Sequence, residues 1–204
     1  MHTMREHWDG VYATKGETEV SWYQPRPERS LALINSAVPD QSAAILDVGG
    51  GTSTLVDGLL AQGYSDLTVL DVSEAALARS KARLGQRAGK VSWIVADITA
   101  WRPPRTWRVW HDRAVFHFLT ATADQDAYIR ALKAATAPGA MVVMSCFALD
   151  GPEKCSGLPV QRYSAAILAA RIGGDFELVS QASERHLTPW QSVQNFSYAV
   201  LKRR

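Results

Sequence analysis

The feature that most constrains this chain is a run of three glycines, Gly49–Gly51, placed directly after the apolar segment Ile45–Val48. A short apolar run that ends in glycine is typical of a buried strand in a parallel sheet. Glycine tolerates positive φ and lets another group approach the backbone closely. The apolar spacing within 53–63 then predicts a helix. The unit is therefore a strand–turn–helix with free backbone amides at the turn.

Apolar runs alternate with amphipathic segments along the rest of the chain. We expect strands at 43–49, 67–71, 91–97, 106–116 and 140–148, and helices at 28–38, 53–63, 73–85, 122–139 and 162–173. Two closing strands, 175–186 and 191–201, are expected to pair antiparallel. This order predicts an α/β fold with a doubly wound, Rossmann-like sheet that is mostly parallel and has an antiparallel last strand.

Local signals refine this prediction. Ser73 is a plausible N-cap, Thr122 with Gln125 forms a capping-box pattern, and Pro138-Gly139 is expected to end the helix that begins at 122. Residues 1–27 show no clear period and are rich in aromatic residues, so we expect an irregular arm there. We take residues 1–204 as one domain.

Composition narrows the class of protein. The chain has 204 residues with 47% hydrophobic residues, enough to bury a core, and its net charge of +2 does not imply a nucleic-acid partner. Its two cysteines are too few for a disulfide framework. No apolar run approaches the ~20 residues of a membrane span, and the N-terminus lacks the apolar core of a signal peptide. We expect a cytoplasmic monomer or homodimer without a membrane partner.

Three ligands compete for the glycine turn. A nicotinamide dinucleotide favours G-x-G-x-x-G, but the third position is Thr54, and a Walker loop would need a following Gly-Lys-Ser/Thr. S-adenosylmethionine carries an amine, which Asp47 could hold, and a carboxylate, which backbone amides could bind. The aminoacyl end of S-adenosylmethionine therefore suits this turn better than a pyrophosphate.

Acids also stand at the ends of the next two predicted strands. Asp71 could accept hydrogen bonds from both ribose hydroxyls. Asp97 could accept one from the adenine amine, while Ile98 covers the ring. Three acids at the ends of successive strands are hard to explain as helix caps alone.

The segments "LDVGGGTS", "VLDVS", "VADIT", "WHDRAVFHFL" and "APGAMVVMS" resemble those of class I S-adenosylmethionine-dependent methyltransferases, over nearly the whole chain from Ser42 onward. The resemblance implies a seven-stranded sheet. Gly50 stands where Cys or Ser is often found. By resemblance the cofactor-binding residues are Asp47, Gly49, Gly50, Gly51, Asp71, Val72, Asp97, Ile98, Asp112 and Trp22.

"WHDRAVF" is similar to the corresponding stretch of thiopurine methyltransferases and of a group of protein-lysine methyltransferases. In the lysine group an N-terminal aromatic arm folds over the cofactor. By this resemblance residues 1–40 are expected to cover the cofactor and substrate site, with Trp22 and Tyr23 as lid residues.

Asp112 and His117 are the catalytic candidates, because a thiol or hydroxyl acceptor would need a base near the end of the fourth strand. The Gly- and Pro-rich segment 150–164 is expected to shape a loop at the same edge, where Asp150, Cys155 and Arg162 could face substrate. A metal held by Cys146, Cys155 and His186 lacks the usual ligand spacing, so we expect none.

The leading hypothesis is a methyltransferase that acts in line on an N, O or S atom of a small molecule and releases S-adenosylhomocysteine. The alternative is a protein-lysine methyltransferase. A different class, a non-catalytic cofactor-binding scaffold, is less consistent with the retained Asp71 and Asp97. Nucleic-acid methylation is disfavoured because no Asn-Pro-Pro-Tyr or Asp-Pro-Pro-Tyr follows the fourth strand.

Overall fold

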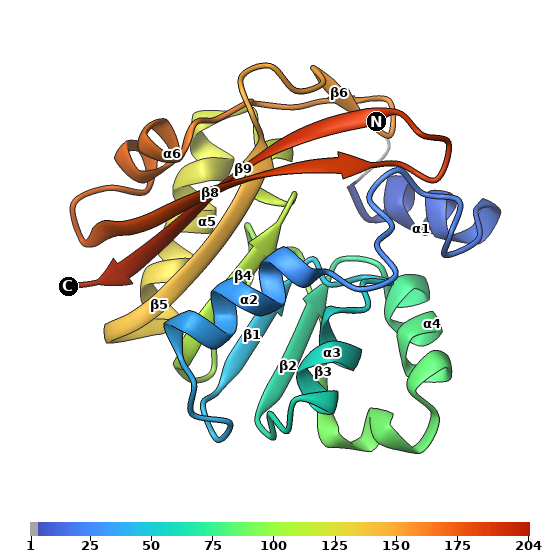
Figure 1. Cartoon of the computed structure of the whole chain (residues 1–204), viewed down its shortest axis with the longest axis horizontal. Helices are drawn as coiled ribbons and strands as arrows, with labels where there is room; N and C mark the ends of the chain where they lie inside the picture. Colours follow the sequence, from blue (N-terminus) through green and yellow to red (C-terminus); the bar gives the residue numbers. More distant parts are fainter. Residues whose placement is uncertain (1–3) are drawn as a thin grey trace.

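A seven-stranded sheet organises residues 4–204, the part of the chain that the computed structural model describes (Figure 1). The strands lie in the order β3-β2-β1-β4-β5-β9-β8, and β9 alone runs opposite to the other six. Their bounds are Ile45–Val48 for β1, Leu67–Asp71 for β2, Val91–Val95 for β3, Trp107–Arg113 for β4, Thr136–Phe147 for β5, Phe176–Leu187 for β8 and Val193–Arg203 for β9. The predicted fold class is confirmed.

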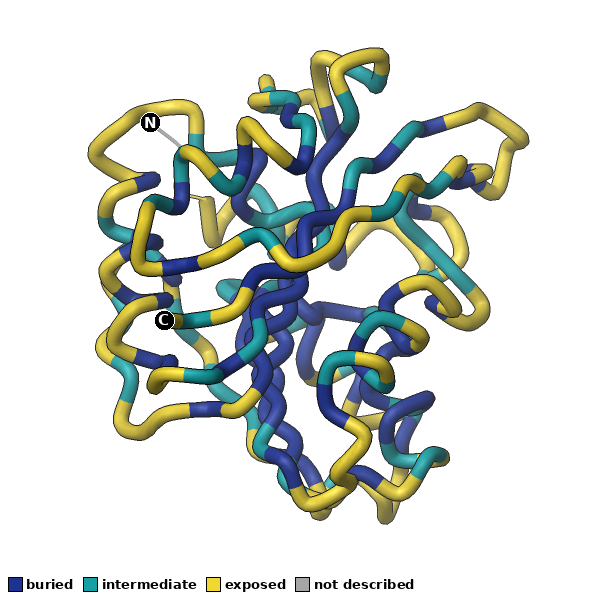
Figure 2. The backbone as a smooth tube through the Cα atoms, turned by 60° about the vertical axis from the view of Figure 1, so that its left-hand side comes forward, coloured by how far each residue is buried: buried dark blue, intermediate teal, exposed yellow. Residues whose placement is uncertain are grey.

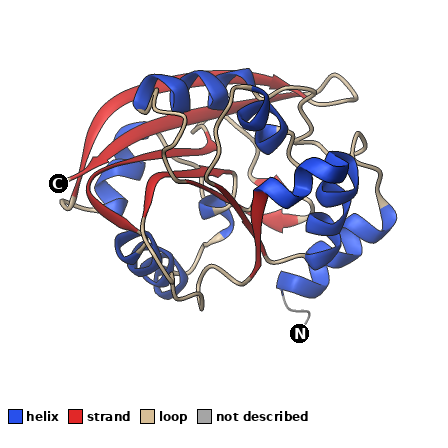
Figure 3. Ribbon diagram, turned by 90° about the horizontal axis from the view of Figure 1, so that it is seen from below, coloured by secondary structure: helices blue, strands red, loops and turns tan. Residues whose placement is uncertain are grey.

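Helices cover both faces of this sheet (Figure 3). One face carries α2 (Glu28–Ala37), α3 (Leu55–Ala61) and α4 (Glu74–Leu84), and the other carries α5 (Thr122–Ala134) and α6 (Ala165–Ile172). The connections contain two short 3-10 helices, Gly85–Lys90 and Phe116–Phe118. They also contain a hairpin of two short strands, β6 (Lys154–Cys155) and β7 (Leu158–Pro159). An apolar core therefore fills each side of the sheet.

The central strands are buried on both faces, and this explains their continuous apolar runs. Every residue of β1 and β2 is buried, whereas β8 at the sheet edge alternates between covered and exposed positions (Figure 2). The antiparallel strand β9 is not at the edge, because it inserts between β5 and β8.

Three local expectations were wrong. Residues Met4–Thr14 form a helix, α1, rather than an irregular arm. The N-cap of α5 is Ala121 without a side-chain cap bond, because the amide of Gln125 instead donates to Leu119 O and accepts from Arg171. That helix ends at Ala134, and Pro138-Gly139 already belongs to β5. The predicted cap at Ser73 is confirmed, since its hydroxyl accepts from the Ala76 amide.

The segment 4–27 lies across the carboxyl ends of the first strands and is fixed there by polar contacts. The Ser73 hydroxyl donates to Asp9, the Thr54 hydroxyl donates to Gln24 O, and His186 Nε2 donates to Ser21 O. We call this segment the arm.

Candidate functional site

A cavity of about 350 Å³ opens at the edge where the parallel strands end. Its floor comes from the ends of β1, β2, β3 and β4, its roof from the arm, and one side from β5 and β9. Most of the lining side chains are apolar. The apolar side chains include Met4, Trp8, Tyr12, Trp22, Leu70, Ile98, Val115, Phe118, Leu119, Phe147 and Phe196. The polar side chains include Asp71, Asp97, Thr99, Arg113, Asp124, Cys155 and Gln194.

Six predicted cofactor residues lie on this wall: Gly49, Asp71, Val72, Asp97, Ile98 and Trp22. Asp47 and Gly50 instead line a smaller neighbouring cavity of about 50 Å³, together with Gly49, Trp22, Tyr23 and His111. Gly51 and Asp112 are on neither wall. The two cavities share Gly49, Trp22 and Arg113, so they meet at the glycine turn.

The glycine turn is crowded by the protein's own atoms. A Cβ at Gly49, where φ is +67°, would lie 2.0 Å from a methyl carbon of Val115. A Cβ at Gly50 would lie 2.6 Å from both Asp47 Oδ2 and Val69 Cγ1, and one at Gly51 would lie 2.8 Å from the Tyr12 hydroxyl. Internal packing therefore excludes side chains at 49–51, whatever ligand the turn also admits. The Cys or Ser often found in place of Gly50 would not fit here without movement.

Asp71 is a buried carboxyl at the end of β2. The Ser73 amide donates to its Oδ1 at 2.8 Å, and the Gly51 and Val72 amides also donate to it. Burial outweighs these donors and, with the nearby charge of Asp47, raises the pKa of Asp71 to about 7. A ligand that offers hydroxyl groups to this carboxylate would offset part of that penalty.

Asp97 and Ile98 follow β3 on the floor of the cavity. The amide and hydroxyl of Thr99 both donate to Asp97 Oδ1, at 2.9 and 2.7 Å, and hold the carboxylate in one orientation. Asp97 is exposed whereas Ile98 is buried. An exposed acceptor beside a buried apolar side chain suits the edge and face of a planar base.

Asp112 faces away from the cavities and holds the turn after β4. Its carboxylate accepts hydrogen bonds from the Val115 and Phe116 amides, at 2.8 and 3.1 Å, and from the Tyr128 hydroxyl. Burial is the main reason that its pKa rises to about 6. These bonds fix the backbone next to Ala114, whose φ is +72°. Asp112 thus shapes the cavity wall, and its position does not support the predicted contact with the sulfonium or substrate.

His117 is also fully buried. Its ring packs against Phe118 and Phe147, at centroid distances of 4.4 and 4.8 Å, and Nδ1 accepts a long bond from the Phe147 amide. Burial and the nearby Arg113 lower the pKa of His117 to about 3. A histidine with this pKa, off the cavity wall, does not fit the predicted role of general base.

Aromatic side chains form a continuous roof. Trp8 contacts Trp22 at 5.6 Å and Phe118 at 5.1 Å between ring centroids, and Tyr12 contacts Trp22 at 6.2 Å. Trp8 and Tyr12 were not among the predicted site residues. Their spacing of four places them on one face of a helix, which is the signal that could have revealed α1.

The 150–164 loop reaches the cavity through Cys155. Burial raises the pKa of the Cys155 thiol to about 11, so the thiol is protonated at neutral pH. Asp150 accepts from Asn195, and Arg162 donates to Gly151 O and Glu153, so both charged residues tie the loop down. Within residues 4–204, no group of three or more His, Cys, Asp or Glu side chains is placed to bind a metal.

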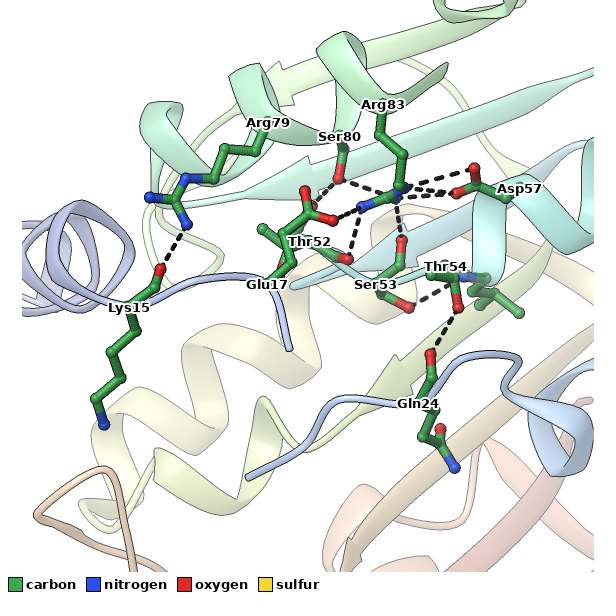
Figure 4. A network of polar contacts seen from close by, with 12 residues as sticks. Lys15, Glu17, Gln24, Thr52, Ser53, Thr54, Asp57, Arg79, Ser80 and Arg83 are labelled. Atoms are coloured by element: carbon green, nitrogen blue, oxygen red, sulfur yellow. Dashed lines mark hydrogen bonds and ion pairs between the residues drawn. The ribbon is translucent and has the colours of Figure 1, made fainter. Parts of the chain in front are cut away.

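Sequence reasoning also missed the network around Arg83 (Figure 4). This α4 side chain donates to Thr52 O and Ser53 O, at 2.9 and 2.8 Å, and pairs with Asp57 of α3 at 2.9 Å and with Glu17 of the arm at 3.2 Å. One guanidinium thus joins the glycine turn, two helices and the arm.

The fold and this site define a nucleoside-binding α/β protein, and comparison with known proteins narrows the class. Residues 45–139 match the methyltransferase-domain family. Over 94 residues the chain is 29% identical to the mouse protein "eEF1A lysine and N-terminal methyltransferase", a stretch that makes up 46% of this chain and 13% of that relative. The chain therefore spans a small part of the curated relatives' length.

Solved structures share the whole fold. The structure titled "Conversion of a Disulfide Bond into a Thioacetal Group during Echinomycin Biosynthesis" superposes with a TM-score of 0.75 at 21% identity, over 98% of this chain and 92% of that one. The N-methyltransferase NodS from Bradyrhizobium japonicum, crystallised with S-adenosylhomocysteine, gives 0.72 at 15% identity over 96% of both chains. Residues 45–139 thus resemble a methyltransferase domain, and the chain shares the fold of S-adenosylmethionine-dependent methyltransferases. Across residues 4–204, none of the helices has the length and apolar character needed to span a bilayer.

Proposed function

We propose that this chain transfers the methyl group of S-adenosylmethionine to a small-molecule acceptor. The observation that carries the proposal is the roofed cavity, in which the acids at Asp71 and Asp97 share one space with the aromatic side chains Phe118, Phe147 and Phe196. A mostly apolar cavity beneath the arm suits a small acceptor better than the surface of a folded protein.

The residues present fit the cofactor. The two ribose hydroxyls would donate to Asp71, the adenine amine to Asp97, and Ile98 and Val72 would cover the base. Asp47 would hold the amine of the amino-acid end in the smaller cavity, whereas the amides expected to bind its carboxylate are already used: those of Gly49 and Gly50 donate to Leu70 O and that of Gly51 to Asp71. When bound, the cofactor supplies a methyl group made electrophilic by positive sulfur.

The chain itself contributes alignment and exclusion of water. The contacting rings of Trp8, Trp22 and Phe118 form one wall that keeps solvent from the reacting atoms. Asp112 and His117 stand behind the wall, so we infer that catalysis depends on positioning rather than on either group as a base. The arm would have to open to admit the cofactor.

A protein-lysine acceptor is the second candidate. The mouse relative's name includes a lysine methyltransferase activity, and a lysine side chain is thin enough to enter the same chamber. A non-catalytic scaffold would bind the cofactor without turnover.

Two measurements test these proposals. Calorimetric titration with S-adenosylhomocysteine should give binding that Asp71→Ala abolishes, and an absence of heat would contradict the cofactor assignment. Transfer of a labelled methyl group into a cell lysate, followed by separation by size, should place the label in the small-molecule fraction. Label on protein would instead support the lysine alternative, and cofactor binding without label would support the scaffold.

A further inference from the structure

A buried hydrogen-bonded chain lies behind the glycine turn and connects α2, β4 and β1. His111 Nδ1 is 2.7 Å from Asp47 Oδ1, and His111 Nε2 is 2.9 Å from Ser30 Oγ. The three residues are between 1% and 4% exposed. Neither His111 nor Ser30 belongs to the predicted site, yet His111 lines the smaller cavity together with Asp47.

The carboxylate fixes the direction of the first bond. A carboxylate can only accept, so the Nδ1–H of His111 donates to Asp47. Nε2 bonds the Ser30 hydroxyl, and the direction of this second bond depends on the protons of the ring. Both ring nitrogens are used, so the imidazole cannot turn without breaking a buried bond.

This arrangement also determines which Asp47 oxygen is available. His111 occupies Oδ1, whereas Oδ2 lies on the Gly50 side, within 2.6 Å of the point where a Cβ of that residue would stand. Asp47 and Gly50 both line the smaller cavity, and the bond from His111 leaves Oδ2 as the Asp47 oxygen that this ring does not use.

We propose that His111, held by Ser30, is a positioning residue that orients Asp47 to select ligands carrying an amino-acid end. The inference rests on the proposed function, because it takes Asp47 as the partner of the cofactor amine. The inference adds a source of selectivity: a nucleoside without the amino-acid end gains no affinity from the Ser30–His111–Asp47 hydrogen bonds.

The test compares two ligands on each variant. S-adenosylhomocysteine has the amino-acid end, whereas 5′-methylthioadenosine keeps the adenine, ribose and thioether and lacks that end. His111→Leu should weaken the first ligand about 10- to 100-fold and the second less than about threefold, since only the first uses Asp47. His111→Asn keeps a donor near the Nδ1 position and should recover most of the loss. Ser30→Ala should give a smaller effect of the same sign.

Thr68→Ala provides the matched control. Thr68 is buried, accepts hydrogen bonds from Trp107 Nε1 and Arg105, and lines neither cavity. Its removal should lower stability and leave the affinity ratio of the two ligands unchanged.

The outcomes separate the two proposals. If the unmodified chain binds neither ligand, the proposed function fails and the inference fails with it. If it binds both, but His111→Leu and Ser30→Ala weaken both ligands equally, the cofactor assignment stands and the positioning role is overturned. Should His111→Leu not fold, Ser30→Ala decides by the same ratio.

Discussion

Asp71 is the residue at which folding and ligand binding conflict. Its carboxyl is 6% exposed, and burial raises its pKa from 3.8 to about 7. The sign follows from linkage: well below the unfolded pKa of 3.8 the group is neutral in both the folded and unfolded states and costs nothing. As the pH rises toward 7, the unfolded chain ionises more readily than the folded one, so the folded state loses stability.

Asp71→Asn should therefore stabilise the ligand-free protein at pH 8 by roughly 2–4 kcal/mol and by little at pH 4.5. The same change should weaken S-adenosylhomocysteine, because an amide accepts ribose hydroxyls less well than a carboxylate. Urea unfolding across this pH range and calorimetry check both effects. The unmodified protein, measured over the same pH range, is the reference. A destabilised Asp71→Asn protein at pH 8 would contradict this account.

Asp112 is an acid at the end of a strand, and its hydrogen bonds stabilise the fold. Asp112→Ala would leave the Val115 and Phe116 amides and the Tyr128 hydroxyl without their acceptor, which should lower the free energy of unfolding by about 3 kcal/mol or more. Tyr128→Phe removes one of these donors and should cost about 1–2 kcal/mol. Under conditions where Tyr128→Phe remains folded, its methyl-transfer rate should stay within a few-fold of the unmodified rate. A loss of rate far beyond the loss of folded protein would restore a catalytic role for this cluster.

At the scale of elements, most of the sheet and its helices could be predicted because each has a strong local signal. The runs in β1 and β2 are apolar throughout, and Ser73 caps α4 as its position indicated. Helix α1 was missed because Gly10 and polar residues interrupt its apolar spacing. Its Tyr12 is buried only by tertiary contacts.

The Arg83 network connects elements that are distant in sequence. Arg83→Met removes the ion pairs to Glu17 and Asp57 and the donors to two turn carbonyls, so it should lower stability by about 2 kcal/mol. It should also weaken S-adenosylhomocysteine several-fold, because the glycine turn loses its anchor. Arg83→Lys should not restore binding, since one ammonium cannot reproduce the planar set of donors.

Arg79→Met is the control within the same helix. Arg79 donates to Lys15 O at an exposed position, so its loss should change stability by less than about 0.5 kcal/mol. Thermal unfolding and calorimetry distinguish the two variants. Equal effects at positions 79 and 83 would mean that α4 itself, rather than the Arg83 guanidinium near its C-terminal end, supports the turn.

For the whole molecule, the alternation of strands and helices was enough to predict the fold, but not how the arm lies over the cavity at the strand ends. The arm's contacts join residues far apart in sequence, such as Asp9 with Ser73 and Gln24 with Glu184. Hydrogen bonds of this kind leave no periodic pattern. The same limit applies to Asp112 and His117: their positions near the end of β4 could be predicted, but not that neither side chain would line a cavity.

The arm differs from the sheet in how it is held. Polar contacts and the aromatic roof fix it in place, whereas β1 and β4 are buried from both sides. Segments held in this way open at a lower free energy than the core. A ligand that contacts both the strand ends and the arm stabilises the closed form, because it binds that form in preference to the open one.

S-adenosylhomocysteine at 100 times its Kd should slow amide hydrogen exchange in the described part of the arm by up to about 100-fold. We expect the amides of β5 and β9 to exchange only on global unfolding. Their exchange should slow by no more than the factor that corresponds to the ligand-induced gain in the free energy of unfolding. Mass spectrometry of exchanged peptides measures both regions in one experiment. Trp8→Ala should reduce the protection of the arm while leaving Asp71 in place. If the ligand protects the ends of β1–β3 and the arm exchanges as before, the arm does not close over the cofactor.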